Sequence, residues 1–264
     1  MFVDSHCHLD KLELAHYPID PENSPLDCAM QAAAESGVSH VLCIGIDLDT
    51  VAQVIQLAEE YPNVYATVGS HPLYQESRAP SVEELVSLAE HPKVIGIGET
   101  GLDYFYVKGD TAWQSERFVS HIQAAKQTGL PLVIHTRSAK EDTLSLLREH
   151  GEGQVKGVLH CFTEDLDMAQ QAVDMGFYIS ISGIVTFNNA HELRAVVEAI
   201  PLERLLIETD APWLTPAPHR GKPNEPKHVT LVAKKIAELK GVTVEEVAAT
   251  TTENFFTLFN KAQS

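Results

Sequence analysis

The residues with the clearest chemical potential are histidines and acids that follow short apolar runs. His6 and His8 come at the end of the first such run, in the segment MFVDSHCHLD. Side chains at positions i and i+2 of a strand point to the same face, so both imidazoles should face one way. Two neutral imidazoles are a minimal ligand set for a divalent metal ion. The pair therefore predicts a metal site at the end of this strand.

Further ligand-type side chains stand at equivalent places later in the chain, each just after an apolar run. Four imidazoles and two carboxylates gathered in one place would be costly to bury without a counter-ion. Mixed nitrogen and oxygen ligands suit Zn or Mn, whereas Mg prefers oxygen. A set of this size, with a carboxylate able to bridge, favours two divalent ions per chain, Mg, Mn or Zn. The expected metal ligands are His6, His8, Glu99, His135, His160 and Asp210.

Eight apolar runs, nearly free of charge, alternate with segments of helical periodicity. This alternation predicts an α/β protein, a (β/α)8 TIM barrel formed by residues 1–264 as one domain. A doubly wound open sheet is the alternative. In a barrel the carboxyl ends of the strands meet at one mouth, which would bring the ligand set together. The runs are Phe2–Ser5, Val41–Ile46, Val64–Gly69, Val94–Gly98, Pro131–Ile134, Gly157–Leu159, Phe177–Ile181 and Leu205–Ile207.

Strand alternation also places residues below the expected ligands. Ile95, Ile97 and Glu99 occupy alternate positions and are expected on one inward face. Glu208 lies one pleat below Asp210, where a carboxylate is suited to orienting a ligand. The remaining histidines considered fall on helical or loop segments and are expected at the surface; they are His16, His91, His121 and His150.

The helical segments between the runs begin with recognisable caps. Ser24 precedes Pro25, a residue favoured at the first helical position, and Gly37 follows as a stop signal. A loop with five prolines, residues 212–226, separates the eighth run from the final helical patterns. Capping boxes are expected at Ser81–Glu84, Ser138–Glu141 and Thr243–Glu246.

The charge balance limits the classes of partner. With 19 basic and 37 acidic residues the net charge is −18, which repels polyanions at long range and argues against a protein that tracks along nucleic acid by a basic surface. A local site whose metal ions supply positive charge is still compatible. No segment reads as a membrane span or signal peptide, and the four cysteines form no CxxC pair. We therefore expect a cytoplasmic protein with free thiols and no membrane partner, monomeric by default.

Two other motifs are weak evidence for a functional site. Gly96–Gly101 matches GxGxxG, but the following residues do not start a helix well, and Glu99 would repel a pyrophosphate. No nucleotide cofactor is therefore expected. Cys161 lies beside His160, but neighbouring residues on a strand point to opposite faces and cannot pair as nucleophile and base.

Eight segments carry a recognisable set of motifs; they are DSHCHLD (4–10), GSHP (69–72), IGETGLDY (97–104), IHTR (134–137), LHCF (159–162), ISGIVTF (181–187), ETDAPWL (208–214) and PHRGKPNEP (218–226). Together they resemble the TatD family of metal-dependent hydrolases, most closely its YcfH-like branch, and so imply a TIM barrel of the amidohydrolase-like type. The resemblance covers essentially the whole chain. It implies that His6, His8 and Asp210 hold a first ion, that Glu99 bridges, and that His135 and His160 hold a second. It also implies deoxyribonuclease activity, since the family includes 3′–5′ exonucleases acting on DNA and sometimes RNA.

The mechanism expected for such a site is attack on phosphorus by a metal-bridging hydroxide. Glu99 and Asp210 are the catalytic candidates; Asp210 either orients or deprotonates the water, or serves only as a ligand. Tyr104, Phe105 and Tyr106 either stack on a base or pack at the barrel lip. Substrate phosphate contacts are expected from His71, Arg137, His219 and Arg220, with a structural role as the alternative for each.

Three functions stay open at this point. The first is a deoxyribonuclease acting on DNA ends or single strands. The second is an amide, ester or lactone hydrolase that uses the same dinuclear site. The third is a metal-bearing protein that binds a partner without turnover.

Overall fold

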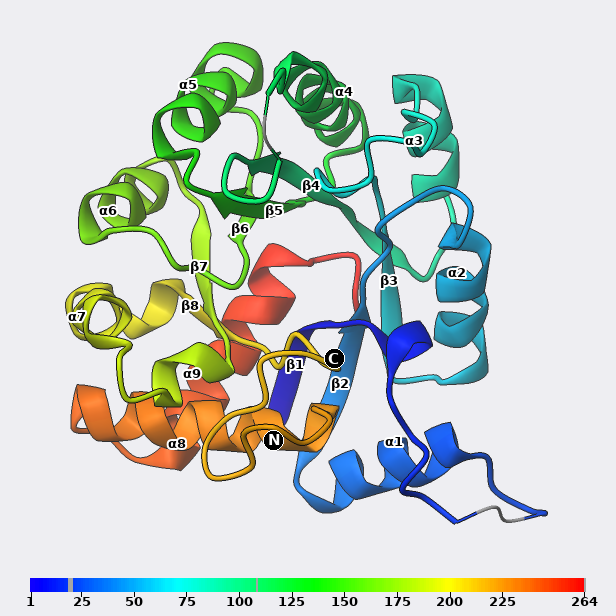
Figure 1. The fold of residues 1–264 in the computed structure, drawn as a ribbon, viewed down its shortest axis with the longest axis vertical. Coiled ribbons are helices and arrows are strands. Elements are labelled where there is room, and N and C mark those ends of the chain that lie inside the picture. Colours follow the sequence, from blue (N-terminus) through cyan, green and yellow to red (C-terminus); the bar gives the residue numbers. More distant parts are fainter. Residues whose placement is uncertain (19–20, 108, 264) are drawn as a thin grey trace.

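The computed structural model describes residues 1–18, 21–107 and 109–263. Eight parallel strands form one sheet in the order β1 to β8, and helices α1 to α8 form a ring around it (Figure 1). The predicted TIM barrel is confirmed. The strands are β1 (Phe2–Cys7), β2 (Val38–Cys43), β3 (Val64–Val68), β4 (Val94–Asp103), β5 (Leu132–Arg137), β6 (Gly157–Leu159), β7 (Tyr178–Ile181) and β8 (Leu205–Ile207).

Most helices follow the strand that they cover, as the alternating pattern predicts. The α-helices are α1 (Pro25–Glu35), α2 (Val51–Glu60), α3 (Val82–Ala89), α4 (Ala112–Thr128), α5 (Lys140–Gly151), α6 (Leu166–Asp174), α7 (His191–Ala199), α8 (Val229–Lys240) and α9 (Val244–Leu258). Short 3-10 helices are η1 (Leu9–Lys11), η2 (Gly183–Thr186), η3 (Leu202–Arg204) and η4 (Pro226–His228).

The seam between β8 and β1 closes at the rim of the barrel. There the His8 amide donates to the Ala211 carbonyl at 2.9 Å, and the Asp210 amide donates to the His6 carbonyl at 2.9 Å. Cys7 and Ala211 form an isolated parallel bridge. The last backbone bonds that close the barrel therefore belong to segments that carry expected metal ligands.

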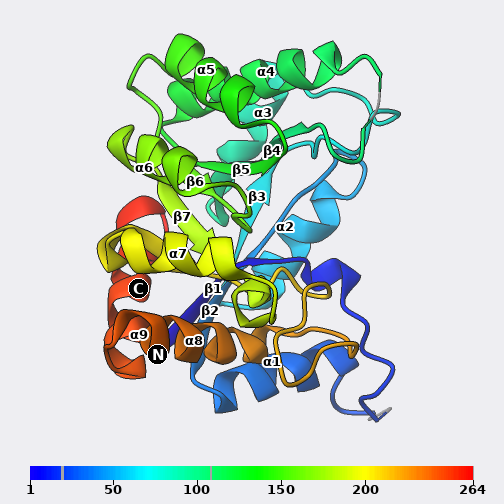
Figure 2. The same ribbon diagram turned by 60° about the vertical axis from the view of Figure 1, so that its left-hand side comes forward.

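The barrel interior is filled by side chains from the strands and plugged at one end by α9. Phe255 of α9 and Phe259 just after it pack with inward residues such as Val3, Ile95 and Val133. Figures 1 and 2 place α9 beside the N-terminus of the chain, at the end of the barrel where β1 begins. The opposite end, where the strands finish, is left free for a site.

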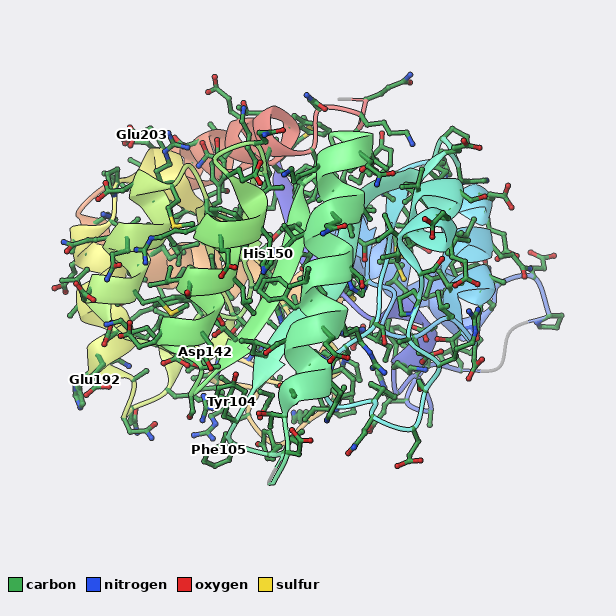
Figure 3. The ribbon with its side chains drawn as sticks, turned by 90° about the horizontal axis from the view of Figure 1, so that it is seen from above. Tyr104, Phe105, Asp142, His150, Glu192 and Glu203 are labelled. Atoms are coloured by element: carbon green, nitrogen blue, oxygen red, sulfur yellow. The ribbon has the colours of Figure 1, made fainter. Side chains whose placement is uncertain are left out.

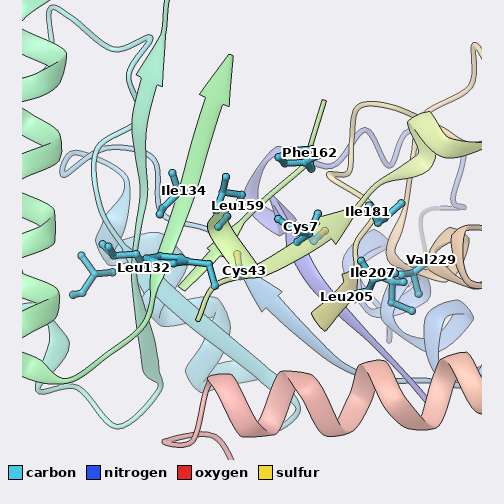
Figure 4. Packing of buried hydrophobic residues seen from close by; sticks show 14 of the residues in the cluster. Cys7, Cys43, Leu132, Ile134, Leu159, Phe162, Ile181, Leu205, Ile207 and Val229 are labelled. Atoms are coloured by element: carbon cyan, nitrogen blue, oxygen red, sulfur yellow. The ribbon is translucent and has the colours of Figure 1, made fainter. Parts of the chain in front are cut away.

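A second layer of apolar side chains lies between the strands and the outer helices. Figure 4 shows part of it, including Cys7, Cys43, Leu132 and Ile134. All four cysteines are free; Cys7 and Cys43 are buried, while Cys28 and Cys161 are partly exposed.

The predicted alternation along β4 is wrong at one position. Ile95 packs inside the barrel, but Ile97 packs in the outer layer. The pairing of β4 with β3 skips one residue beside Ile95, and its pairing with β5 shifts again between Ile97 and Thr100. Such irregularities change which face a side chain occupies. The second shift turns Glu99 back toward the interior.

Strand and cap boundaries also differ in places from the sequence-based expectation. β4 runs on to Asp103, five residues beyond the predicted end at Gly98. Ser81 forms the expected capping box with Glu84. The box predicted at Ser138–Glu141 is wrong, because α5 begins after Ala139 and Ser138 adopts a left-handed backbone with φ 54°.

Two other helix starts follow the sequence, one fully and one in part. Ser24 caps α1 with Pro25 at the first helical position, and Asp27 completes a capping box there. Thr243 caps α9 by accepting from the Glu246 amide, which is only one of the two bonds of the predicted capping box. Within the described residues, no helix combines the length and apolar character that crossing a bilayer requires.

Candidate metal centre

His6 and His8 meet two carboxylates at the barrel mouth. Their Nε2 atoms lie 3.3 Å apart. Glu99 Oε2 is 3.3 Å from His6 Nε2 and 3.9 Å from His8 Nε2. Asp210 Oδ1 lies 3.6 Å and 3.5 Å from the same two nitrogens. Two imidazoles and two carboxylates therefore converge on one small volume.

The other oxygen of Glu99 faces a second group of imidazoles. Glu99 Oε1 lies 2.8 Å from His160 Nε2, 3.1 Å from His71 Nε2 and 3.5 Å from His135 Nδ1. Glu99 is only 2% exposed. One buried carboxylate thus divides the cluster into two halves, with one oxygen toward each.

The chemistry of these atoms fits divalent ions. Ring nitrogens and carboxylate oxygens converge with no lysine or arginine among them, and their combination is one that such ions bind. Burial alone would raise the pKa of the Glu99 carboxyl, but the histidines around it outweigh burial and hold that pKa well below its usual range. Groups able to hold an ion are His6 with His8 and Glu99, His71 with Glu99 and His135, and His6 with His160 and Glu208.

Two carboxylates behind the cluster orient its imidazoles. Asp103 Oδ2 lies 2.9 Å from His135 Nε2, which directs the other nitrogen of that ring toward Glu99. Glu208 Oε1 lies 3.3 Å from His160 Nδ1 and leaves Nε2 facing Glu99. A carboxylate on the far ring nitrogen selects the tautomer that presents a lone pair to a metal.

Asp103 is a residue that sequence reasoning missed. The expected end of the fourth strand at Gly98 left it in a loop, whereas β4 continues through it. Its spacing of four residues from Glu99 in GETGLD was the available signal, since both share the inward parity once the strand is extended. Burial alone would raise the pKa of Asp103, but the bond to His135 and two backbone amides lower it.

Asp4 links the strand that carries His6 and His8 to the segment that carries Glu208 and Asp210. It is fully buried and accepts from the Thr209 amide at 2.8 Å and from the Thr209 hydroxyl. Thr209 lies between Glu208 and Asp210, and Asp4 lies two residues before His6. This link holds β1 and the end of β8 in register where both carry site residues.

Comparison with known proteins identifies the lineage of this site. The model of the family described as TatD related DNase matches residues 3–260. The chain belongs to the TatD family.

Relatives of this TatD protein carry a coarse functional name. It is 46% identical over 258 residues to the uncharacterized metal-dependent hydrolase YcfH of Escherichia coli K12, covering 98% of this chain and 95% of the relative. It is 41% identical to the uncharacterized metal-dependent hydrolase YabD of Bacillus subtilis, covering 98% and 99%. The crystal structure of YjjV, a TatD homologue from Escherichia coli K12, superimposes with a TM-score of 0.87 at 31% identity over 98% of both chains. This TatD protein is therefore a metal-dependent hydrolase.

A cavity of about 550 Å³ opens onto the candidate metal centre of this TatD protein. Arg137 is the one lysine or arginine among its described lining residues. Its Nη1 donates to Thr163 Oγ1 at 2.8 Å, and its guanidinium lies 5.1 Å from the centre of the Phe105 ring. Arg137 is thus held at the cavity wall.

His71 lies deeper in the site than a substrate contact alone would need. Its Nε2 faces Glu99, and its Nδ1 accepts from the Leu73 amide at 3.1 Å. His219 and Arg220, the other expected contacts, are not among the lining residues of this cavity. The stacked rings of His219 and His228 have their centroids 5.0 Å apart. The guanidinium carbon of Arg220 lies 3.9 Å from the centre of the Phe187 ring.

The three aromatic residues after β4 have different environments. The Tyr104 hydroxyl donates to Asp142 at 2.7 Å, and Figure 3 shows Tyr104 and Phe105 together near Asp142. Tyr106 is 67% exposed and lines the cavity. Trp213 is 50% exposed and lines the same cavity. Its ring centroid lies 5.1 Å from that of His8, in an edge-on arrangement.

One expected surface histidine is buried in the TatD barrel. His121 has no exposed surface, whereas His16 is exposed and both His91 and His150 are partly exposed. The expectation for His121 was wrong because the face of α4 that turns toward the barrel carries polar residues. A helix with polar side chains on both faces conceals which face is buried.

Proposed function

We propose that this TatD protein hydrolyses phosphodiester bonds at DNA ends or in single strands. The observation that carries the proposal is Glu99, a buried carboxylate whose two oxygens each face a separate group of imidazoles at the cavity floor. Two cations bound on either side of Glu99 would suit the double negative charge that develops on a phosphoryl group during hydrolysis.

We assign the ligands in two sets. His6, His8 and Asp210 would hold one ion, His135 and His160 the other, and Glu99 would contact both. Bound divalent ions of the Mg, Mn or Zn class would stabilise negative charge on the phosphoryl oxygens and lower the pKa of a water molecule.

Asp210 is the protein group best placed to orient the attacking water. Its side chain is 14% exposed, so it reaches the cavity. Burial alone would raise its pKa, but its bond to His8 and the charges of His6 and His160 lower it. An ionised carboxylate at this place can orient a water molecule or hold an ion.

The side chains of the cavity wall suit a substrate that has aromatic rings and one phosphate group held by one guanidinium. Tyr74, Tyr106 and Trp213 line it and are exposed, and Arg137 supplies one fixed guanidinium. Aromatic side chains stack on bases without sequence preference, and a guanidinium binds phosphate through paired donors. This favours a strand end or a short single strand over a long polyanion, as the −18 charge also does.

The test is an assay of the purified protein with Mg, Mn and Zn on end-labelled single-stranded DNA, beside a panel of esters, amides and lactones. We expect progressive loss of nucleotides that disappears with EDTA and in Glu99→Gln. Turnover of esters or amides with intact DNA would instead identify the second class of hydrolase. Absence of turnover on every substrate would favour a metal-bearing binding protein.

We further propose that the protein works in the cytoplasm as a single-domain monomer. Four free cysteines fit a reducing compartment, and the barrel accounts for every described strand. Equilibrium sedimentation and fractionation of cells test the two parts of this statement.

A further inference from the structure

Helix α4 buries a row of polar side chains against the barrel. Gln114 and His121 have no exposed surface, and Arg117 is 7% exposed. Their spacing of three and four residues puts them on one face of the helix. Polar groups are costly to bury unless their hydrogen bonds are made inside the protein, so the partners of this row matter.

His121 holds the backbone immediately before His71. Its Nδ1 lies 2.7 Å from the Arg117 carbonyl oxygen, which can only accept, so Nδ1 carries the proton. Nε2 then presents a lone pair, and the Ser70 amide donates to it at 3.0 Å. His121 is therefore an acceptor fitted to one particular amide of the loop after β3.

Arg117 holds the same loop on both sides of His71. Its Nη1 donates to Ser70 Oγ at 3.0 Å and to the Tyr74 carbonyl at 2.9 Å, and its Nη2 donates to the Ser77 carbonyl at 3.0 Å. One buried guanidinium thus spans residues 70–77, with His71 inside that span.

Gln114 connects the loop to the partner of His135. Its Nε2 donates to the Pro72 carbonyl at 3.0 Å and to the Asp103 carbonyl at 3.2 Å, and its Oε1 accepts from the Asp103 amide at 2.9 Å. Asp103 in turn holds His135. The row on α4 therefore binds the backbone next to His71 and also the backbone of the residue whose side chain holds His135.

We propose that Gln114, Arg117 and His121 of α4 are positioning residues that set the place of His71 over the metal centre. The backbone of the loop 70–77 positions the His71 ring, because its Nδ1 accepts from the Leu73 amide within that loop. Its Nε2 faces Glu99 Oε1 at 3.1 Å. A rigid loop keeps that nitrogen aimed into the cavity. The activity readouts below rest on the proposed function, whereas the exchange readout does not.

The first test replaces the acceptor on α4. His121→Leu removes the bond to the Ser70 amide, and His121→Gln keeps a side-chain acceptor of similar reach. Hydrogen exchange followed by mass spectrometry should show exchange of the segment 69–77 rising about fivefold in His121→Leu, the effect of losing one net hydrogen bond. His121→Gln should resemble the wild type. Unchanged exchange in His121→Leu would overturn the proposal.

The second test asks whether the effect passes through His71. We expect His121→Leu to lower kcat/KM by about tenfold to a hundredfold, as a displacement near 1 Å does. That loss should vanish when His71 is already alanine, because a positioning residue has nothing left to position. Full additivity of the two changes would mean that His121 acts only on general stability.

A matched control comes from the other end of the barrel. Asn254 of α9 is 6% exposed and donates to the Leu202 and Leu205 carbonyls at 2.9 Å and 2.8 Å. Asn254→Leu should also destabilise the fold, yet leave the exchange of 69–77 and kcat/KM near wild type. Equal losses of kcat/KM in Asn254→Leu and His121→Leu would contradict positioning.

The proposal can still be tested if His121→Leu does not fold or if the wild type does not cleave DNA. Should His121→Leu fail to fold, Arg117→Lys carries the same test, because one ammonium group cannot span the three acceptors of Arg117. Should the wild type leave DNA intact, the proposed nuclease activity fails, while the exchange data, and kcat/KM on whichever ester or amide is hydrolysed, still decide whether α4 positions His71.

Discussion

At the scale of single residues, Glu99 has the greatest influence on the site. Among the described residues it is the one side chain whose two oxygens face both halves of the cluster. Its neighbours supply nitrogen ligands, and Asp103 and Glu208 hold two of those rings from behind. Sequence spacing predicted Glu99 and Glu208 in these places but missed Asp103, because the expected strand ended at Gly98 and left Asp103 in a loop.

Glu99→Gln should lower kcat by about a thousandfold, since it removes a negative ligand and leaves the opposing histidines without their counter-charge. Metal content measured by atomic spectroscopy should fall with it. Glu203→Gln is the control, because Figure 3 shows Glu203 at the far end of the molecule from Tyr104 and Phe105. A Glu99→Gln protein with full activity and full metal content would refute the assignment.

Asp103→Asn should weaken metal binding by about 10- to 100-fold, because an amide no longer enforces the His135 tautomer that faces Glu99. Titration calorimetry with Zn or Mn measures this directly. Asp142→Asn is a suitable control, since Asp142 accepts from Tyr104 on the same rim. Equal affinities in both variants would show that the bond between Asp103 and His135 is only structural.

At the scale of elements, the strands place the ligands and the helices hold the strand ends. Local signals were reliable where the stabilising contact is itself local, as at the caps of α1 and α3. They failed at α5, where Ser138 has the right spacing but its amide donates to Glu164, twenty-six residues away. A tertiary contact there replaces the local cap.

Ser81→Ala and Ser138→Ala separate these two cases. Ser81→Ala should lower the free energy of unfolding by about 1 kcal/mol, since the hydroxyl accepts from the Glu84 amide. Ser138→Ala should change it by less than about 0.5 kcal/mol, because its hydroxyl caps no helix. Urea denaturation of both variants measures the difference. Equal losses of stability would indicate that Ser138 does cap α5.

At the scale of the whole molecule, buried histidine links stability to pH. Burial lowers the pKa of His121 to about 4 from its usual 6.5, so the unfolded chain binds a proton on this residue at a higher pH than the folded protein does. Its contribution to stability is complete above pH 6.5 and is lost as the pH falls toward 4. One pKa unit is worth about 1.4 kcal/mol, so the loss reaches roughly 3 kcal/mol.

Urea denaturation between neutral pH and pH 4.5 measures this dependence. The decline on acidification should be shallower in His121→Gln, which cannot titrate. His228, whose pKa burial also lowers to about 4, contributes equally to both proteins and so serves as an internal reference. Parallel declines in the wild type and the variant would show that His121 does not bind a proton on unfolding.

The net charge of −18 leads to an unusual expectation for salt. Raising monovalent salt from about 10 mM to about 100 mM shortens the Debye length to about 10 Å and weakens repulsion between the protein and a polyanion. KM for a long single strand should therefore fall, whereas KM for a dinucleotide should change little. A KM for the long strand that climbs steeply with salt, as for basic DNA-binding proteins, would contradict this expectation.

The sequence by itself determined the α/β alternation, the eight strands and the chemistry of the ligand set, because each follows from periods and spacings within a few residues of chain. Only the tertiary structure decided that His71 lies against Glu99 and that a polar row on α4 holds its loop. The Ser70 amide and His121 are 51 residues apart, and Asp4 and Thr209 are 205 apart. Such contacts depend on how the barrel closes and on where β4 shifts its register, and no local pattern encodes either.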